Sequence, residues 1–202
     1  MHGAIGAIAP NDSVERFTGL GVQVIEDEGK FVDANTVEAG DTRITARRFV
    51  IATGSSAFVP AIPGLSDVPF YTNENVFYAD ELPKHLIVIG GGPIGIELAQ
   101  AHRQLGCDVT VLEVFKVMAK DDQELVEVVR AQLDAEGLVI REDVKISRIE
   151  KSGDGIAVVL ESDEGEETLD GSHLLVATGR RSNVNGLNLE AANVTYSPKG
   201  IE

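Results

Sequence analysis

The chain has 202 residues, which is enough to bury a sizeable core in one large domain or in two small ones. Apolar residues make up 43% of it and charged residues 25%, and no apolar run is long enough for a membrane span or a secretion leader, so we expect a cytoplasmic protein. The formal net charge of −16 argues against nucleic-acid and membrane-surface partners, and the single cysteine, Cys107, excludes an intramolecular disulfide.

The first fifty residues predict a short helix and then a β-meander. Asp12 or Ser13 can cap the helix, and Gly19 and Gly21 can end it. Short runs rich in strand-forming residues follow, separated by turn residues, at 22–25, 30–32, 36–38 and 43–46. They lead to an apolar run at 48–54, which we interpret as a strand that ends in Ala-Thr-Gly.

A proline-rich connector with one helical turn at 73–82 precedes the part of the chain with the clearest pattern. Residues 86–89 form the continuous apolar run of a strand that is buried on both faces of a parallel sheet. A helix is predicted to start at Pro93 and to end at Gly106, and residues 109–112 predict a second strand. The helix residues that we expect to face the sheet are Ile94, Leu98, Ala101 and Leu105.

The connection between this strand and this helix contains the motif G-x-G-x-x-G. Gly90 allows a tight turn, Gly92 lets a dinucleotide pyrophosphate approach the backbone, and Gly95 lets the helix pack closely on the strand. The start of the helix attracts phosphates, and Glu113 follows the second strand where this motif holds the adenosine ribose. These features together predict a dinucleotide site, and a purely structural glycine turn is the alternative.

The rest of the chain completes a mixed α/β pattern. A helix capped by Asp121 is predicted up to Glu136, with Leu125, Val129 and Leu133 on its buried face. Strands are predicted at 138–140, 145–150, 156–160, 164–169 and 174–176. The first of them is predicted to be buried, and the last leads again to Ala-Thr-Gly, at 177–179. We therefore predict an α/β fold in which a Rossmann-like parallel sheet carries a β-meander, next to part of a second nucleotide-binding unit.

These features resemble the FAD-dependent pyridine nucleotide-disulfide oxidoreductases, and in particular the branch of dihydrolipoamide dehydrogenase and mercuric reductase. The motifs that carry the resemblance follow the family's order, at 51–55, 62–65, 90–97, 111–113, 177–180 and 186–187. The resemblance implies that residues 1–80 are the C-terminal half of an FAD-binding domain, that 81–181 are the NAD-binding domain and that 182–202 return to the FAD domain.

Three parts of that family do not occur in the sequence: the N-terminal FAD glycine motif, the redox pair C-x4-C and the C-terminal interface domain. We therefore expect a central fragment, whose partner is the missing remainder of a parent chain that is itself a homodimer. We expect no catalytic residue and no metal site within it.

The resemblance also implies roles for individual residues. The NAD pyrophosphate would be lined by Gly90, Gly91, Gly92, Pro93, Ile94 and Gly95. Glu113 would hold the adenosine ribose, Ile146 would lie near the adenine and Gly179 would approach the nicotinamide half. Glu97 would lie near the nicotinamide and the flavin, with a first-turn acid that complements the helix dipole as the alternative. In the parent enzyme, FAD would be approached by Thr53, Gly54 and the backbone of Gly29.

The family reaction implied by this resemblance passes a hydride between NAD(H) and flavin and electrons to a disulfide or metal-ion acceptor, a role in cell redox homeostasis. We expect NAD rather than NADP, because Glu113 would repel a 2′-phosphate and Lys116 is the only cation close to it in sequence. By itself the fragment is expected to bind NAD(H), to retain no stoichiometric FAD and to have no activity. The alternatives are a stand-alone NAD-sensing module and a flavoprotein of the NADH oxidase or ferredoxin reductase groups.

Overall fold

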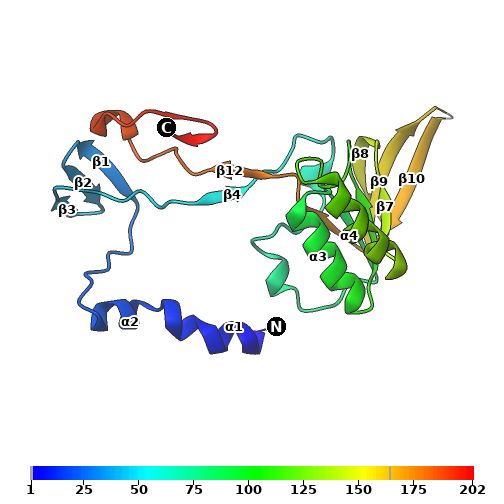
Figure 1. The fold of residues 1–202 in the computed structure, drawn as a ribbon, viewed down its shortest axis with the longest axis horizontal. Coiled ribbons are helices and arrows are strands. Elements are labelled where there is room, and N and C mark those ends of the chain that lie inside the picture. The colour runs from blue at the N-terminus through cyan, green and yellow to red at the C-terminus, as the bar shows by residue number, and fades with distance from the viewer. Residues whose placement is uncertain (1, 164) are drawn as a thin grey trace. The chain divides into compact units, whose positions relative to one another are not determined.

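The computed structural model describes residues 2–163 and 165–202, and Figure 1 traces them. The chain divides into two compact units, of which the first is Met1–Ser56 with Arg181–Glu202 and the second is Ala57–Arg180. The connector 57–80, which we expected to belong with the first half, is part of the second unit. The assignment of the two units to FAD and NAD remains a prediction.

The first unit combines short helices with a small antiparallel sheet. Its elements are α1 (His2–Ile8), η1 (Ala9–Asp12), α2 (Val14–Gly19), β1 (Gly29–Asp33), β2 (Thr36–Ala39), β3 (Thr42–Thr45), η4 (Leu189–Ala192), β13 (Tyr196–Ser197) and β14 (Gly200–Ile201). The predicted short helix is confirmed in α2, where the Ser13 hydroxyl accepts a hydrogen bond from the Arg16 amide at 3.2 Å. Strands β1, β2 and β3 form the meander, and Phe31 packs with Val184 and Leu189 in its small core.

Two strands predicted in this unit are wrong. Residues 22–25 and 48–54 form no regular structure, so the meander has three strands rather than four. A strand needs a neighbour to accept and donate its backbone hydrogen bonds. No strand within residues 2–163 and 165–202 pairs with either run, and the side chain of Val50 is 92% exposed.

The second unit is built on a four-stranded parallel sheet in the order β11-β5-β6-β7, which confirms the predicted α/β fold. Its regular elements are η2 (Leu65–Asp67), η3 (Val76–Tyr78), β5 (His85–Ile89), α3 (Pro93–Gln104), β6 (Asp108–Leu112), α4 (Gln123–Ala135), β7 (Val139–Arg141), β8 (Lys145–Ser152), β9 (Gly155–Ser162), β10 (Gly165–Gly171) and β11 (His173–Val176). Strands β8, β9 and β10 form the predicted antiparallel sheet, and η3 is the predicted helical turn. Position 164, the first of the predicted strand 164–169, lies outside the described residues. Two further strands, β4 (Ser55–Ala57) and β12 (Arg180–Ser182), pair with each other.

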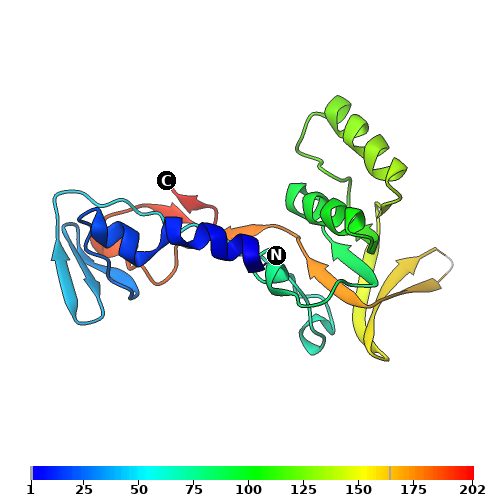
Figure 2. The ribbon, with the colours of Figure 1, turned by 90° about the horizontal axis from the view of Figure 1, so that it is seen from below.

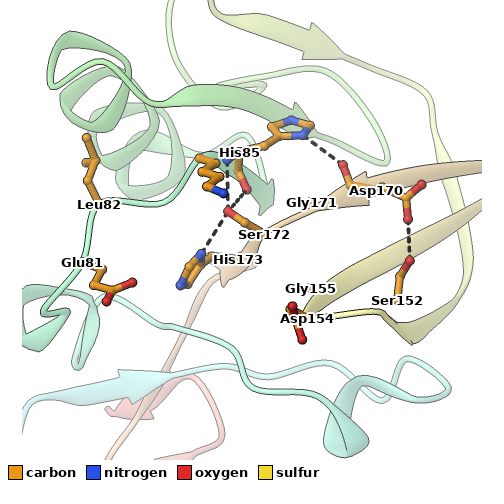
Figure 3. A pocket seen from close by; sticks show the side chains of 11 residues that line it. Glu81, Leu82, His85, Ser152, Asp154, Gly155, Asp170, Gly171, Ser172 and His173 are labelled. Atoms are coloured by element: carbon orange, nitrogen blue, oxygen red, sulfur yellow. Dashed lines mark hydrogen bonds between the residues drawn. The ribbon is translucent and has the colours of Figure 1, made fainter.

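Polar side chains join the two sheets at the amino ends of β5 and β11, around a depression of about 420 Å³ (Figure 3). The Ser172 hydroxyl donates to the His85 carbonyl at 2.9 Å, and the His85 amide donates to the Ser172 hydroxyl at 3.0 Å. The ring of His85 contacts the Asp170 carbonyl and the Thr110 hydroxyl, both at 2.9 Å. Among the described residues no buried side-chain nitrogen or oxygen lacks a partner, and no group of three potential ligands could hold a metal ion. We interpret the polar contacts at the amino ends of β5 and β11 as structural, since they join the two sheets.

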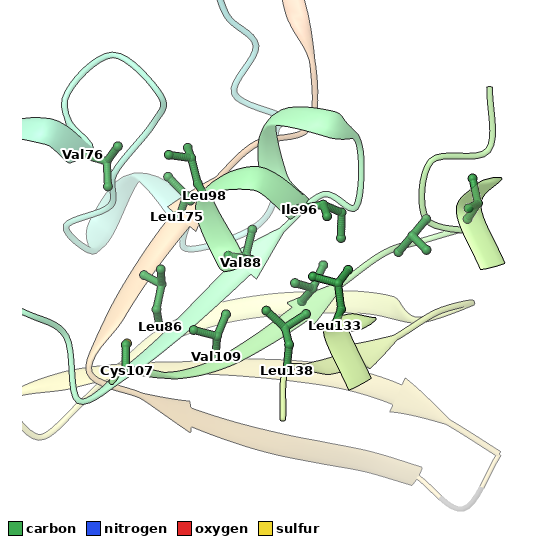
Figure 4. Packing of buried hydrophobic residues seen from close by; sticks show 14 residues of the cluster. Val76, Leu86, Val88, Ile96, Leu98, Cys107, Val109, Leu133, Leu138 and Leu175 are labelled. Carbon is green, nitrogen blue, oxygen red and sulfur yellow. The ribbon is translucent and has the colours of Figure 1, made fainter. Parts of the chain in front are cut away.

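The parallel sheet is buried on both faces because alternate residues of a strand point to opposite sides. In β5, Leu86 and Val88 pack with buried residues of α3 and α4 (Figure 4). Ile87 and Ile89 pack on the other side, with buried residues of β8 and β9. Figure 2 shows the two helices on one side of the sheet and the antiparallel strands on the other. This three-layer packing explains the continuous apolar run in the sequence.

The buried face of α3 differs from the prediction. Leu98 is buried and Ile94 is partly buried, as expected, but Ala101 and Leu105 are exposed. The helix buries Gly95, Ile96, Leu98 and Ala99 instead. The predicted positions follow one row of the helix, whereas the contact with the sheet is centred on the first two turns, where Gly95 brings the backbone closest.

The buried face of α4 also differs. Leu133 is fully buried, but Leu125 is 66% exposed and Val129 is exposed, while Val126 occupies the core. Asp122 caps the helix in place of Asp121, and its carboxylate accepts from the Glu124 amide at 3.1 Å. The buried stripe of α4 is therefore narrower than predicted, since Val126 and Leu133 are the buried residues of this helix.

The outermost strand of that sheet is β7, which we had predicted as a buried strand. It pairs only with β6 among the described strands, and Val139 is exposed. Burial at an edge is one-sided, so this part of the prediction is wrong.

In the described part of the chain, no helix is both long and apolar enough to cross a bilayer.

The two leucines of α4 provide a direct test of its packing. We expect Leu133→Ala to lower the free energy of unfolding by about 2–5 kcal/mol, because it leaves a cavity in the core. Leu125→Ala removes the same atoms from an exposed position and should change stability by about 0.5 kcal/mol or less. Urea unfolding of the 202-residue chain, followed by circular dichroism, measures both. Equal losses would contradict the observed helix face.

Candidate dinucleotide site

The carboxyl ends of β5, β6 and β11 meet at one edge of the parallel sheet. Gly90 follows β5 and donates its amide to the Leu112 carbonyl at 2.9 Å, and the Ala177 amide donates to the Ile89 carbonyl at 2.8 Å. The chain leaves β5 toward β6 on one side, while β11 lies on the other side of β5, so the strand order reverses here. In open α/β sheets ligands bind at such an edge, beside the reversal.

The packing around the glycine turn explains why two of its glycines are required. Gly90 has φ +111°, and a Cβ there would lie only 2.7 Å from the carbonyl carbon of Ala177. A Cβ on Gly95 would overlap the carbonyl oxygen of Gly90, so α3 could not approach the end of β5. Both positions therefore have the close approaches that the motif predicts.

Gly92 differs from these two glycines. A Cβ built on it would meet no atom of the described residues within 4 Å, and its φ of −74° suits any residue. The protein's own packing therefore does not require glycine at this position. The open space lies at the start of α3, where Gly92 caps the helix and the uncharged residues Pro93 and Ile94 begin it. The amides of a first helical turn have no intrahelical acceptor, and together with the helix dipole they favour an anion.

Glu113 lies directly beside the glycine turn. Its carboxylate accepts hydrogen bonds from the Gly91 amide at 2.6 Å and from the Phe115 amide at 3.0 Å. A carboxylate can accept about four hydrogen bonds, so these two amides fix its position and leave acceptor capacity for a ligand hydroxyl. A Cβ on Gly91 would press on Val117 and Glu113, which is a reason for glycine that the motif alone does not supply.

Two more of the predicted NAD residues lie in the same unit. The Val144 amide donates to the Glu113 carbonyl at 3.1 Å, which brings the chain just before β8, and hence Ile146 within it, next to the end of β6. Gly179 follows β11 with φ +138°, and its carbonyl accepts from the Phe58 amide at 2.9 Å. Glu97 is exposed in the second turn of α3, so the alternative that it is a first-turn acid is wrong.

The residues assigned to FAD by resemblance lie in the first unit. Gly29 begins β1 and pairs with Ala39. The Thr53 hydroxyl donates to the Asn183 carbonyl at 2.7 Å, and the Asn183 amide donates to the Gly54 carbonyl at 3.0 Å. No local pattern in the sequence points to Asn183, because its contact with Thr53 spans 130 positions. Whether these residues contact FAD stays a prediction.

Gly92 and Gly95 form a matched pair for a test of the glycine turn. We expect Gly92→Ala to leave the stability of the chain nearly unchanged, because the new methyl group meets open space. Gly95→Ala should lower the free energy of unfolding by about 1–3 kcal/mol or more, because the methyl group overlaps a backbone oxygen. Thermal unfolding of the two variants measures the difference. An equally large loss in Gly92→Ala would show that the protein itself fills this space.

Comparison with known proteins gives consistent matches over nearly the whole chain. A family model described as pyridine nucleotide-disulphide oxidoreductase matches residues 7–202. A mercuric reductase of Bacillus cereus is 37% identical over 181 residues, which cover 89% of this chain and 29% of that protein. A dihydrolipoamide dehydrogenase of Chaetomium thermophilum is 34% identical over 195 residues, which cover 91% of this chain and 38% of that protein.

Solved structures give the same picture. The HOCl-induced flavoprotein disulfide reductase RclA of Escherichia coli, solved as a Cu(II) complex, superposes with a TM-score of 0.82 at 26% identity, over 92% of this chain and 43% of that one. LpdA of Mycobacterium tuberculosis superposes with a TM-score of 0.81 at 25% identity, over 98% of this chain and 46% of that one. The chain thus spans less than half the length of each of these four proteins.

Proposed function

Since the chain belongs to the pyridine nucleotide-disulphide oxidoreductase family, we propose that it supplies the NAD(H) site of an FAD-dependent oxidoreductase. When bound, the nicotinamide and the flavin supply the hydride chemistry, and electrons go on to a disulfide or metal-ion acceptor in the whole enzyme. The residues of this chain bind and orient the dinucleotide. In this proposal the second unit is the NAD-binding domain and the first unit belongs to the FAD-binding domain.

The observation that supports this proposal best is the fixed position of Glu113 beside an open helix start. The Gly91 amide holds the carboxylate at 2.6 Å, while the space next to Gly92 is free of described protein atoms. A pyrophosphate at the start of α3 would accept hydrogen bonds from backbone amides. The ribose would then extend toward Glu113, whose remaining acceptor sites suit a pair of hydroxyl groups.

The same carboxylate favours NADH over NADPH. A 2′-phosphate would bring a second negative group close to Glu113, and two like unit charges about 4 Å apart repel by about 1–4 kcal/mol near a protein surface. Since about 1.4 kcal/mol corresponds to a tenfold change in affinity, we expect a preference of the order of tenfold or more.

A thermal-shift titration of the 202-residue chain with NADH and NADPH tests the proposal. NADH at one hundred times its dissociation constant should stabilise the chain by about 2.7 kcal/mol, and NADPH at the same concentration, if it binds tenfold more weakly, should stabilise it by about 1.4 kcal/mol. Glu113→Gln should weaken NADH binding by about tenfold, because it removes charge-assisted hydrogen bonds. Glu127→Gln makes the same charge change at an exposed position of α4 and should have no effect. No stabilisation by either dinucleotide would contradict the proposed site.

The flavin content of the purified chain tests a second part of the proposal. The residues assigned to FAD make only one side of a flavin site, so we expect the 202-residue chain to be purified with much less than one flavin per chain. Flavin absorbance after acid release measures this ratio. A yellow protein with one FAD per chain would contradict this expectation and would leave the NAD(H) site to be tested by the titration.

A further inference from the structure

Two loops meet at the predicted adenosine end of the site. One loop follows β6 and begins at Glu113, and the other follows β7. The Glu113 amide donates to the Arg141 carbonyl at 2.9 Å, and the Asp143 amide donates to the Phe115 carbonyl at 3.1 Å. The Val144 amide also donates to the Glu113 carbonyl. The backbone of the loop that positions Glu113 is therefore bonded to the loop that contains Glu142 and Asp143.

The charged side chains of these loops are paired with one another. The Lys116 ammonium lies 2.5 Å from Oδ2 of Asp143 and 3.5 Å from Oε2 of Glu142. The Arg130 guanidinium, from α4, lies 2.8 Å from Oε2 of Glu142. Oε1 of Glu142 accepts a hydrogen bond from the Val117 amide at 2.9 Å. Lys116 and Arg130 are thus both held by acids of the loop that follows β7.

The exposure and the pKa shifts of these side chains agree with the ion pairs described above. The side chain of Glu142 is only 14% exposed, and that of Asp143 is 65% exposed. Burial raises the pKa of Glu142, but the Val117 amide and the charges of Arg130 and Lys116 outweigh it, so the net pKa is lowered. The hydrogen bond to Asp143 raises the pKa of Lys116. Glu142 and Lys116 therefore remain charged at neutral pH.

We propose that Glu142 and Asp143 determine the dinucleotide preference together with Glu113, by holding Lys116 and Arg130 in ion pairs and so withholding both cations from a 2′-phosphate. This inference rests on the proposed NAD(H) site. Glu142 and Asp143 act through Lys116 and Arg130, and they need no contact with the dinucleotide.

The charge balance shows why the pairing matters. Lys116 follows Glu113 by three positions on a short loop. If its ammonium were released from the ion pairs, it would attract the 2′-phosphate that Glu113 repels. With the ion pairs formed, the three acids Glu113, Glu142 and Asp143 outnumber the two cations. Without the charges of Glu142 and Asp143, the cations are in excess, and the repulsion by Glu113 is opposed.

The double variant Glu142→Gln with Asp143→Asn tests this inference with little change in shape. Glutamine keeps an acceptor for the Val117 amide, and asparagine tolerates the positive φ of +54° at position 143. Fluorescence titrations with NADH and NADPH give the ratio of the two dissociation constants. We expect the double variant to shift this ratio toward NADPH by about tenfold, as one released charge-assisted contact would.

The two released cations should be the residues through which the shift arises. In the double variant, Lys116→Met should reduce the gain in NADPH affinity and Lys116→Met with Arg130→Met should abolish it, whereas Lys116→Met in the original chain should change the ratio little, because the ammonium is already paired. Lys120→Met is the matched control, since Lys120 lies in the same loop after Met118 and outside the ion pairs given above. A second control, Glu127→Gln with Asp134→Asn, removes two charges from exposed positions of α4.

Three results would overturn the inference: an unchanged ratio in the double variant, the same shift in the α4 control, or a shift that survives the removal of both Lys116 and Arg130. If the double variant does not fold, the single change Asp143→Asn at the more exposed position should give a smaller shift in the same direction, and its absence would also overturn the inference. Failure of the original chain to bind NADH would contradict the proposed function itself. NADH binding with an unchanged ratio would contradict only the role of Glu142 and Asp143.

Discussion

The second unit depends on one close contact, between the start of α3 and the end of β5. Gly95 lies so close to the carbonyl oxygen of Gly90 that a Cβ on Gly95 would overlap this oxygen. Because the two backbones touch, the start of α3 is held at the carboxyl end of β5, where the Gly91 amide reaches the carboxylate of Glu113 after β6. Gly90, with its positive φ, makes the turn that this contact requires. The positions of Gly92 and Glu113 follow from this geometry.

The layers on either side of the sheet keep this contact in place. The strand β5 has a parallel neighbour on each edge and an apolar layer on each face. A strand enclosed in this way cannot shift by one residue, since a shift would exchange the side chains of its two faces. The carboxyl end of β5 is therefore a rigid base for the glycine turn.

The sequence alone was sufficient to predict the structure where burial or backbone geometry leaves a local pattern. The strands at 86–89 and 109–112, the tight turn at Gly90, the close packing at Gly95 and the family relationship were all predicted and are confirmed. The sequence was insufficient where the outcome depends on a distant neighbour. Leu105 and Leu125 fit a helical period, yet which row of a helix is buried is decided by the layer that it meets.

The remaining differences have the same origin. The run at 48–54 has the composition of a strand but no described strand beside it. The contact of Asn183 with Thr53 and the ion pairs of Lys116 join residues far apart in sequence, and surface charges of either sign are equally compatible with the local pattern. The predicted contacts with NAD and FAD are of a different kind, since they depend on ligands and remain predictions.

The glycine contact and the ion pairs of Glu142 and Asp143 differ in how freely evolution can change them. Almost any replacement of Gly95 would disturb the packing of a helix on a sheet, so this position is tied to the survival of the fold. The ion pair of Lys116 with Asp143 joins two exposed side chains on loops, where replacement of a charged residue costs little stability. Descendants of this chain could therefore exchange their cofactor preference through a few neutral steps in these loops while the scaffold beneath stays constant.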